Sequence, residues 1–152
     1  MNQPNWLDPD ELRAWRTFVE ATQLLFDRLD RQLQQDSGLS HADYELLIRL
    51  SEAADQRMRM SELAEQTLFS RSRLSHAIAR IEQAGWVRRE GCPSDKRGTF
   101  AVLTPEGRQV LEAAAPGHVA AVRHHLFDQL TPVQRRQLQQ IANRIREQLG
   151  HP

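Results

Sequence analysis

The sequence predicts a mainly α-helical protein that carries one small β-hairpin. Apolar residues recur every three or four positions over most of the chain, which is the spacing of amphipathic helices. The exception is a pair of strand-like runs, 86–90 and 99–104, on either side of the charged, turn-forming segment GCPSDKRG. We therefore expect about six helices, with the hairpin between the fourth and the fifth.

Capping residues mark the first two helices. The segment DPDE at 8–11 combines a cap, a proline at the first helical position and a closing glutamate, so a long helix should run from here to Gly38. Ser40 and Asp43 form a second capping box, which opens the next helix. The long helix carries one apolar face, made of Trp15, Phe18, Val19, Leu25, Leu29 and Leu33.

A short helix, a tight turn and a second helix are expected in the middle of the chain. Ser61 should cap the first of these, SELAEQTL. Ser70 should cap the second, RSRLSHAIARIEQA, which should stop at Gly85. The alternating run 57–60 before them could add a short strand.

Two further helices are expected after the hairpin. Thr104-Pro105 pairs a cap with a proline at the first helical position, and Pro116-Gly117 should kink or break the helix that follows. Thr131 and Gln134 form a capping box for the final helix. Its apolar stripe consists of Leu138, Ile141, Ala142, Ile145 and Leu149.

The composition excludes several classes of protein. No apolar run approaches the ~18 residues that a membrane helix needs, and the first fifteen residues lack the pattern of a secretory signal. The single cysteine, Cys92, excludes an internal disulfide and fits a reducing compartment. We therefore expect a cytoplasmic protein with no cofactor.

Positive charge is concentrated in one segment. The net charge of the chain is zero, but residues 1–50 carry a net charge of −4 and residues 70–97 a net charge of +4. A local basic segment of this kind is typical of a surface that binds nucleic acid.

The helix over residues 71–83 has two faces. At 100° per residue, Leu74, Ala77, Ile78 and Ile81 share one arc and should face the core. The other side is small, polar and cationic, which suits an approach to the major groove of DNA. An ordinary solvated helix face is the alternative. The candidate DNA-binding residues are Ser70, Arg71, Ser72, Arg73, Ser75, His76 and Arg80.

The tip of the hairpin is the second candidate for contact with DNA. An arginine such as Arg97 suits the minor groove, where the negative potential is strong, and Lys96 adds a second charge. Asp95 would be repelled by phosphate, so we expect it to orient an arginine, either Arg97 or one on the helix 71–83. The alternative is a charged turn that binds nothing.

Together these segments resemble the MarR family of winged helix–turn–helix transcriptional regulators over nearly the whole chain. The most specific part is the D-x-R-G tip followed by L-T-x-x-G. The residues that carry the resemblance are Ser61-Glu62-Leu63-Ala64, Ser70, Ser72, Leu74, Ser75, Ile81, Glu82, Gly85, Asp95-Lys96-Arg97-Gly98 and Val102-Leu103-Thr104-Pro105-Glu106-Gly107.

The resemblance implies an obligate homodimer on double-stranded DNA. Residues 1–39 and 105–152 would form the dimerisation region, and residues 40–104 the DNA-binding domain. Two copies would bind a pseudo-palindromic operator as a repressor, and a small ligand or an oxidant would release the DNA. By the same resemblance, Arg97 enters the minor groove and Asp95 helps to hold it.

Three features invite further hypotheses. Trp15, Phe18 and Tyr44 could bind a phenolic or other aromatic effector, although aromatic residues at helical spacing are more often core. Cys92 could act as a redox sensor near basic residues, or be a bystander. No cysteine or paired acid accompanies the histidines to complete a metal site, so none is expected at His118, His124 and His125.

A DNA-binding regulator is therefore the expected function. No nucleophile elbow, Gly-rich phosphate loop or HExxH helix supports an enzyme. A winged-helix module that binds proteins instead of DNA is the remaining alternative, but such a module would not need the basic face or the arginine of the hairpin.

Overall fold

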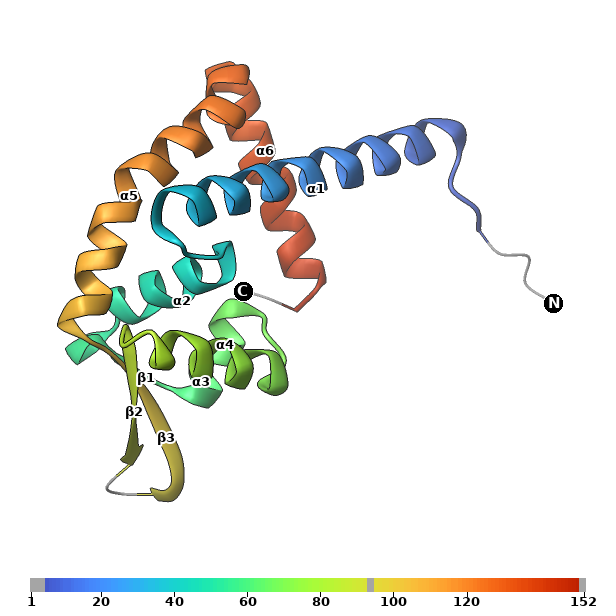
Figure 1. Ribbon diagram of the computed structural model, residues 1–152. Coiled ribbons are helices and arrows are strands. Elements are labelled where there is room, and N and C mark those ends of the chain that lie inside the picture. The colour runs from blue at the N-terminus through green and yellow to red at the C-terminus, as the bar shows by residue number, and fades with distance from the viewer. Residues whose placement is uncertain (1–4, 93–94, 151–152) are drawn as a thin grey trace. The chain divides into compact units, whose positions relative to one another are not determined.

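The computed structural model describes residues 5–92 and 95–150, with the backbone alone for residues 95–97 (Figure 1). The described part of the chain contains six α-helices, three strands and two short 3-10 helices. In chain order these are α1 (Pro9–Ser37), α2 (His41–Glu52), a 3-10 turn (Ala54–Gln56), β1 (Arg57–Arg59), α3 (Met60–Thr67), α4 (Arg71–Gln83), β2 (Val87–Cys92), β3 (Asp95–Leu103), α5 (Pro105–His125), a 3-10 turn (Phe127–Gln129) and α6 (Pro132–Gln148).

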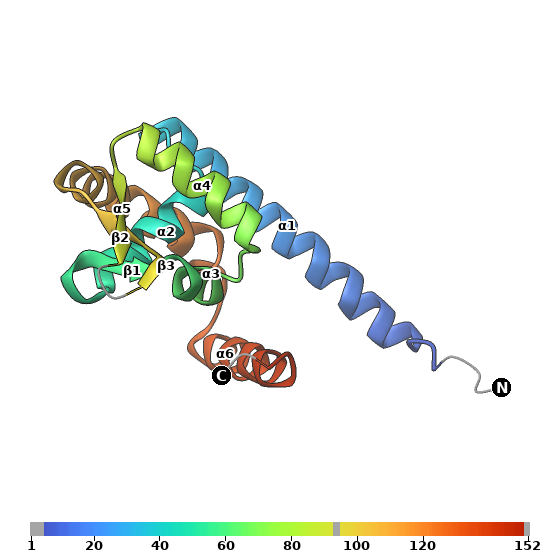
Figure 2. The same ribbon diagram turned by 90° about the horizontal axis from the view of Figure 1, so that it is seen from below.

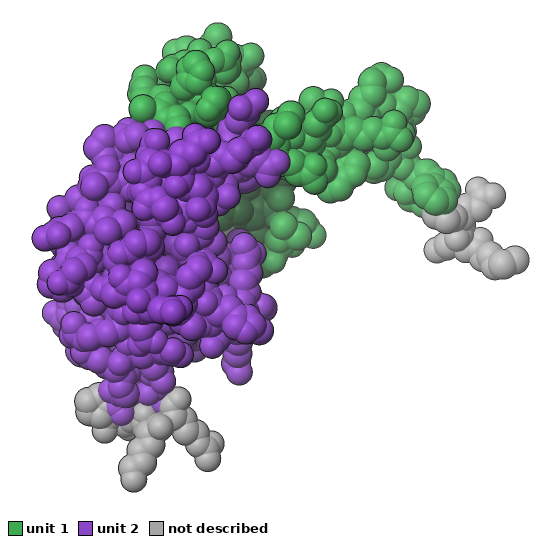
Figure 3. Space-filling view, in the orientation of Figure 1, with its two compact units in different colours: residues 1–25, 119–152 green, residues 26–118 purple. Residues whose placement is uncertain are grey.

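The chain divides into two compact units, which are coloured separately in Figure 3. Unit 1 consists of residues 1–25 and 119–152, and unit 2 of residues 26–118. Unit 2 therefore holds the strands, α2 to α4, the end of α1 and most of α5. Among the described residues, no helix is both long and apolar enough to cross a membrane.

The strands of unit 2 form one antiparallel sheet in the order β1-β3-β2. Met58 pairs with Ala101, and Val87 pairs with Leu103, while the register shifts between Gly91 and Cys92. Figure 1 shows the paired strands β2 and β3 projecting from the helices as a wing. The view from below shows α4 along its length, with α3 and the strands beside it (Figure 2).

The core of unit 2 is built from the inner faces of α2, α3 and α4 and from the sheet. Burying each large aliphatic side chain contributes about 1.5–3 kcal/mol, so this cluster fixes how the helices pack. The largest fully buried side chains are Leu33, Leu39, Leu46, Leu47, Leu50, Leu63, Leu74, Ile78, Ile81 and Val87.

Most predicted helix starts are confirmed, with one shift. The capping boxes of α2 and α6 are present at Ser40 and Thr131, and the Ser70 hydroxyl accepts from the backbone N–H of Arg73. Ser61, by contrast, does not cap α3. That helix begins at Met60 with Arg59 as its N-cap, two residues before the predicted cap, because the chain passes directly from β1 into the helix.

Two other sequence predictions were wrong in extent. The segment GCPSDKRG was expected to be a loop, but β2 continues to Cys92 and β3 starts at Asp95, since the backbone groups pair across the hairpin. A kink or a break was expected at Pro116. The break is wrong, since α5 is one helix from Pro105 to His125, and the kink stays a prediction. A proline removes one hydrogen bond, and the bonds on either side are enough to continue the helix.

The L-T-x-x-G motif closes the base of the wing. The Thr104 hydroxyl donates to the carbonyl oxygen of Gly85 at 2.7 Å and accepts from the backbone N–H of Gly107 at 3.0 Å. Gly107 also lies directly against the backbone of Trp86, where an added Cβ would come within 2.8 Å of the carbonyl carbon. The motif thus joins the turn after α4 to the start of α5.

Gly107→Ala should destabilise the protein by roughly 1–3 kcal/mol, because the new methyl group meets backbone rather than a flexible side chain. Urea unfolding measures the change. Gly91→Ala is the matched control, since nothing lies within 4 Å of its added Cβ. Equal stability of the two variants would contradict the close approach at Trp86.

Candidate DNA-binding surface

Helix α4 presents the face that its sequence predicts. Leu68, with a left-handed backbone φ of 58°, ends α3 and redirects the chain into the turn before α4. Leu74, Ala77, Ile78 and Ile81 are buried, each at most 4% exposed. Every candidate DNA-contacting residue of this helix is exposed, namely Arg71, Ser72, Arg73, Ser75, His76 and Arg80. Ser70, at the N-cap, is also exposed.

Two residues outside α4 fix the directions of two arginines on this face. The guanidinium of Arg73 lies over the ring of Phe69, 4.1 Å from its centroid. Arg80 forms an ion pair with Asp43 of α2, whose carboxylate is buried. Both arginines line a hollow of about 490 Å³ along α4, together with Ser70, Ser72 and His76.

A third contact attaches the wing to α4. Arg89 of β2 donates from Nε to Glu82 at 2.8 Å, and its backbone N–H donates to the same carboxylate at 3.0 Å. The hydrogen bond from Arg89 holds the pKa of Glu82 below its ordinary value of 4.5. Glu82 was named only among the residues that carry the family resemblance, and Arg89 was not among the DNA-binding candidates. No local pattern pairs them, because only the turn after α4 brings them together.

A smaller hollow of about 290 Å³ lies between α3, α4 and the wing. Ser61 and Ser75 line it with the cations Arg59 and Arg89. Neither arginine is among the residues that the sequence predicts to contact DNA. Arg59 lies on the short strand β1, and its position beside the wing follows from the pairing of β1 with β3 rather than from any local pattern.

The predicted residues of the wing tip are placed only in part. The backbones of Asp95, Lys96 and Arg97 belong to β3, at the end of the strand that lies far from α4 (Figure 1). Their side chains lie outside the described residues, so the expected pairing of Asp95 with an arginine stays a prediction.

Cys92 is buried at the end of β2, at 8% exposure. Its Sγ atom accepts a hydrogen bond from the Arg59 guanidinium at 3.2 Å. A nearby cation favours a thiolate, whereas burial restricts the access of an oxidant. The redox hypothesis therefore has one feature in its favour and one against it.

The three aromatic candidates for effector binding have different surroundings. Trp15 and Phe18 are 56% and 54% exposed on the part of α1 in unit 1, whereas Tyr44 is buried in the core of unit 2. In unit 2, the rings of Phe26, His41 and Phe69 line a hollow of about 540 Å³ that Arg73 also lines.

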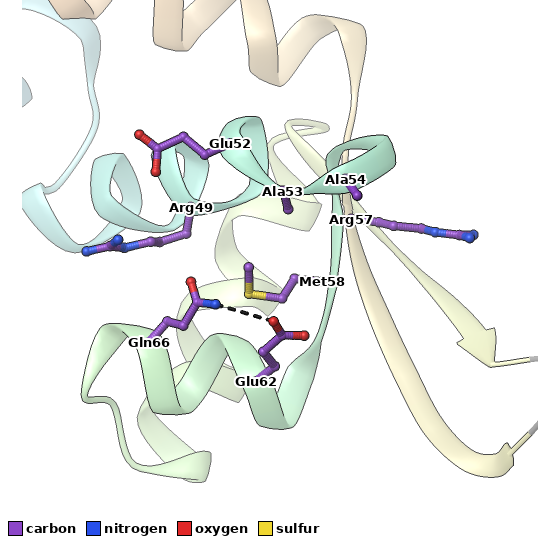
Figure 4. Close-up of a pocket in the computed structure, with 8 residues that line it drawn as sticks. All are labelled: Arg49, Glu52, Ala53, Ala54, Arg57, Met58, Glu62 and Gln66. Carbon is purple, nitrogen blue, oxygen red and sulfur yellow. Dashed lines mark hydrogen bonds between the residues drawn. The ribbon is translucent and has the colours of Figure 1, made fainter. Parts of the chain in front are cut away.

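Two other groups of residues are a charged hollow in unit 2 and the side chains of the metal-ligating types. Figure 4 shows the residues that line a hollow of about 310 Å³ between α2, β1 and α3, among them the cations Arg49 and Arg57 and the acids Glu52 and Glu62. Its charges balance, and its lining holds no nucleophile beside a base. Within the described ranges, no three His, Cys, Asp or Glu side chains are arranged to hold a metal ion.

The predicted histidines are divided between the two units. The rings of His124 and His125 in unit 1 lie 4.9 Å apart. His118 is buried in unit 2, with its ring 4.4 Å from that of Tyr44 and 5.7 Å from that of His41. Among the residues that the structure describes, its Nδ1 atom has no hydrogen-bond partner. Burial lowers the pKa of His118 from its ordinary 6.5, and nearby His41 lowers it further, while Glu45 opposes both effects.

Comparison with known proteins identifies the family. A sequence model of the MarR family matches residues 37–98. The structure of Sco3205, a MarR family transcriptional regulator from Streptomyces coelicolor solved in complex with DNA, matches with a TM-score of 0.94. The two sequences are 54% identical, over 98% of this chain and 93% of that one. This chain belongs to the MarR family. Its fold is the winged helix, and its family is one of transcriptional regulators rather than enzymes.

Two further MarR relatives agree with this assignment. AbsC, also a MarR family transcriptional regulator from S. coelicolor, is 48% identical with a TM-score of 0.91, over 96% of this chain and 98% of that one. The transcriptional repressor YetL of Bacillus subtilis (strain 168) is 30% identical over 60% of this chain. The match spans only 57% of the length of YetL.

The pKa of His118 predicts a loss of stability in mild acid. Because the folded pKa is lowered, the unfolded chain binds a proton first, so stability is full above 6.5 and falls as the pH drops through that value. Urea unfolding at about pH 8 and about pH 5.5 should show a smaller loss for His118→Gln than for the wild type. His76→Gln, on the exposed face of α4, should behave like the wild type. An equal loss in all three proteins would contradict the prediction.

Proposed function

We propose that this protein is a sequence-specific DNA-binding repressor that acts as a homodimer on a pseudo-palindromic operator. The observation that carries the proposal is the exposed face of α4, where Arg71, Arg73 and Arg80 stand among small polar residues while the opposite face is buried. A helix with this division can enter the major groove without losing its packing.

The relatives support the same function. Sco3205 was solved in complex with DNA, and its similarity covers the whole of the winged helix in this chain. YetL is a repressor, which supports repression as the direction of control. The role would place the protein in the cytoplasm, where the DNA is.

The wing supplies the second contact in this proposal. Its tip extends from the same unit as α4, and Lys96 and Arg97 are the basic residues there. Arg97 would enter the minor groove, where the negative potential is strongest over narrow stretches, and Asp95 would hold the arginine in place.

The apolar surface of unit 1 supports a dimer. No residue of α6 is buried. Its apolar stripe is therefore exposed, with Ile141 at 57% and Ile145 at 45%. Apolar side chains that lie exposed along one face of a helix are typical of interaction surfaces, and symmetric dimers dominate soluble oligomers. A second copy of the chain would cover the stripe and set two recognition helices about one DNA turn apart. The other large apolar residues exposed in unit 1 are Trp6, Leu7, Trp15, Phe18, Leu24, Val119, Val133, Leu138 and Leu149.

Control by a small aromatic ligand is the remaining part of the proposal. The hollow of about 540 Å³ in unit 2 combines the rings of Phe26 and Phe69 with the guanidinium of Arg73. A ligand that displaced Phe69 would free an arginine of the recognition helix from its stacking partner. Trp15, Phe18 and Tyr44 remain separate candidates for effector binding, as the sequence predicts, and oxidation of Cys92 is the alternative signal.

A salt-titrated mobility-shift assay on the DNA upstream of the gene tests the function. A repressor should bind a specific site, and its affinity should fall steeply with salt, because each contacted phosphate releases counterions. Binding no tighter than that to unrelated DNA would instead favour a winged-helix module that binds proteins.

Arg73→Ala should weaken operator binding by about 1–3 kcal/mol, roughly 5- to 150-fold, if Arg73 reaches a guanine. The loss should depend on the base at one operator position, which competition with substituted operators measures. Arg13→Ala, which removes the same charge from the exposed surface of α1, is the control. A uniform loss across all operators would make Arg73 a phosphate contact.

Ile141→Asp should turn the dimer into a monomer, because it places a charge in the proposed interface. Sedimentation equilibrium measures the mass, and the monomer should bind the palindromic operator more weakly than the wild type. Gln140→Asp puts the same charge on the opposite side of α6 and should leave the dimer intact. A dimeric Ile141→Asp protein would place the interface elsewhere.

A further inference from the structure

The carboxylate of Asp43 connects two elements of the DNA-binding unit. Asp43 lies in the first turn of α2 and is only 3% exposed. One oxygen accepts from the backbone N–H of Ser40 at 3.2 Å and from its hydroxyl at 2.6 Å, which closes the capping box. The carboxylate also accepts from Nε of Arg80 at 3.3 Å and from Nη2 of the same residue. One buried group thus holds the start of α2 and an arginine of α4.

The buried carboxylate of Asp43 holds the guanidinium of Arg80 in one orientation. A buried carboxylate is strongly unfavourable unless it is both paired and hydrogen-bonded, and Arg80 supplies the opposite charge. Arg80 on the solvent side is 56% exposed, so without Asp43 its long side chain would sample many rotamers. The pair therefore fixes an otherwise mobile guanidinium.

The bidentate contact leaves a defined part of Arg80 available. A guanidinium has five N–H donors in one plane, and Asp43 uses two of them, on Nε and Nη2. The three others, on Nη1 and Nη2, stay available at the outer end of the side chain. That end suits a tetrahedral phosphate, which accepts two parallel hydrogen bonds from an arginine.

The position of Arg80 on α4 selects the backbone of DNA rather than a base. Arg80 lies in the last turn of α4, whereas recognition helices contact base edges with residues near their N-terminus. Arg73, near the start of the helix, is held by a ring instead of a carboxylate. The two arginines therefore have different restraints and different targets.

We propose that Asp43 is a positioning residue for DNA binding, which holds Arg80 of the recognition helix so that its outer N–H groups meet one phosphate. The inference rests on the proposed DNA-binding function. Asp43 does not itself contact DNA, and it acts through the orientation of Arg80. The same carboxylate makes that orientation depend on the first turn of α2.

The direction in which one substitution changes the affinity for DNA separates a positioning role from a simple effect of charge. Asp43→Asn removes a negative charge close to the DNA surface, so charge alone predicts tighter binding. Positioning predicts weaker binding, because an amide holds the guanidinium less firmly and its N–H₂ group faces another donor. The two explanations therefore predict opposite changes in affinity.

The experiment compares operator affinities by fluorescence anisotropy over a range of salt concentrations. Asp43→Asn and Arg80→Ala should each weaken binding roughly tenfold, and Arg80→Ala should lower the salt slope by about one. The double variant should bind no more weakly than Arg80→Ala, since both changes remove the same contact. Circular dichroism at the assay temperature identifies the folded variants.

Arg80→Lys keeps the charge and keeps the test informative if Asp43→Asn does not fold. Lysine lacks the planar fork, so it cannot bind Asp43 side-on and present a second pair of donors, and binding should weaken although the charge is unchanged. Ser40→Ala is the matched control, because it removes the hydroxyl from the same carboxylate and leaves the ion pair. It should lower the melting temperature and leave affinity within about twofold.

Four results would overturn the inference. The first two are unchanged or tighter binding by Asp43→Asn and wild-type affinity of Arg80→Lys. The third is a loss of affinity in Ser40→Ala equal to that in Asp43→Asn. The fourth is a loss of affinity in Arg80→Ala that depends on the base at one operator position. Each of them leaves the proposed function intact as long as the wild type binds its operator. Failure of the wild type to bind specifically would overturn the proposed function and this inference with it.

Discussion

The burial of one side of α4 is the constraint on which the rest of the DNA-binding unit depends. Leu74, Ile78 and Ile81 are each at most 1% exposed, so the rotation of this helix about its axis is fixed by the apolar contacts they make. Once that rotation is fixed, the polar residues between them must lie on the solvent side of the helix. The surface proposed to read DNA is therefore the side of α4 opposite its buried apolar residues. Because those residues are closely packed, they also fix the position of the exposed side.

Polar contacts then restrain the elements and the long side chains around α4 that the core does not hold in place. Thr104 connects the turn after α4 to α5, and Arg89 attaches β2 to the last turn of α4 through Glu82. Asp43 does the same for α2 and Arg80. Each contact joins α4 or the turn after it to another element, so helix and wing are restrained by several neighbours. Long basic side chains gain direction only when such partners reduce their rotamer freedom.

In unit 1, by contrast with α4, an apolar helix face is exposed. Its helices have regular caps and a continuous apolar stripe, yet the stripe on α6 is exposed within the chain. A helix of 17 residues with no buried side chain is not stabilised by its own unit, because most helical stability in proteins comes from packing an amphipathic face. The proposed dimer accounts for this exposed surface and for the two-fold symmetry that a palindromic operator requires.

The sequence by itself determined the elements and the two faces of α4. Local signals decide these features: the caps at Ser40, Ser70 and Thr131, and the 3.6-residue spacing of Leu74, Ile78 and Ile81. The tertiary structure alone decided which charges are paired. Asp43 and Arg80 are 37 residues apart, and Arg59 and Cys92 are 33 apart, so no local pattern indicates either contact. It also decided that the hairpin pairs beyond its predicted strands and that α5 runs through Pro116, because backbone hydrogen bonds outweighed the turn and proline signals. Periodicity records which side of a helix is apolar, and only the packed chain determines what each polar side chain meets.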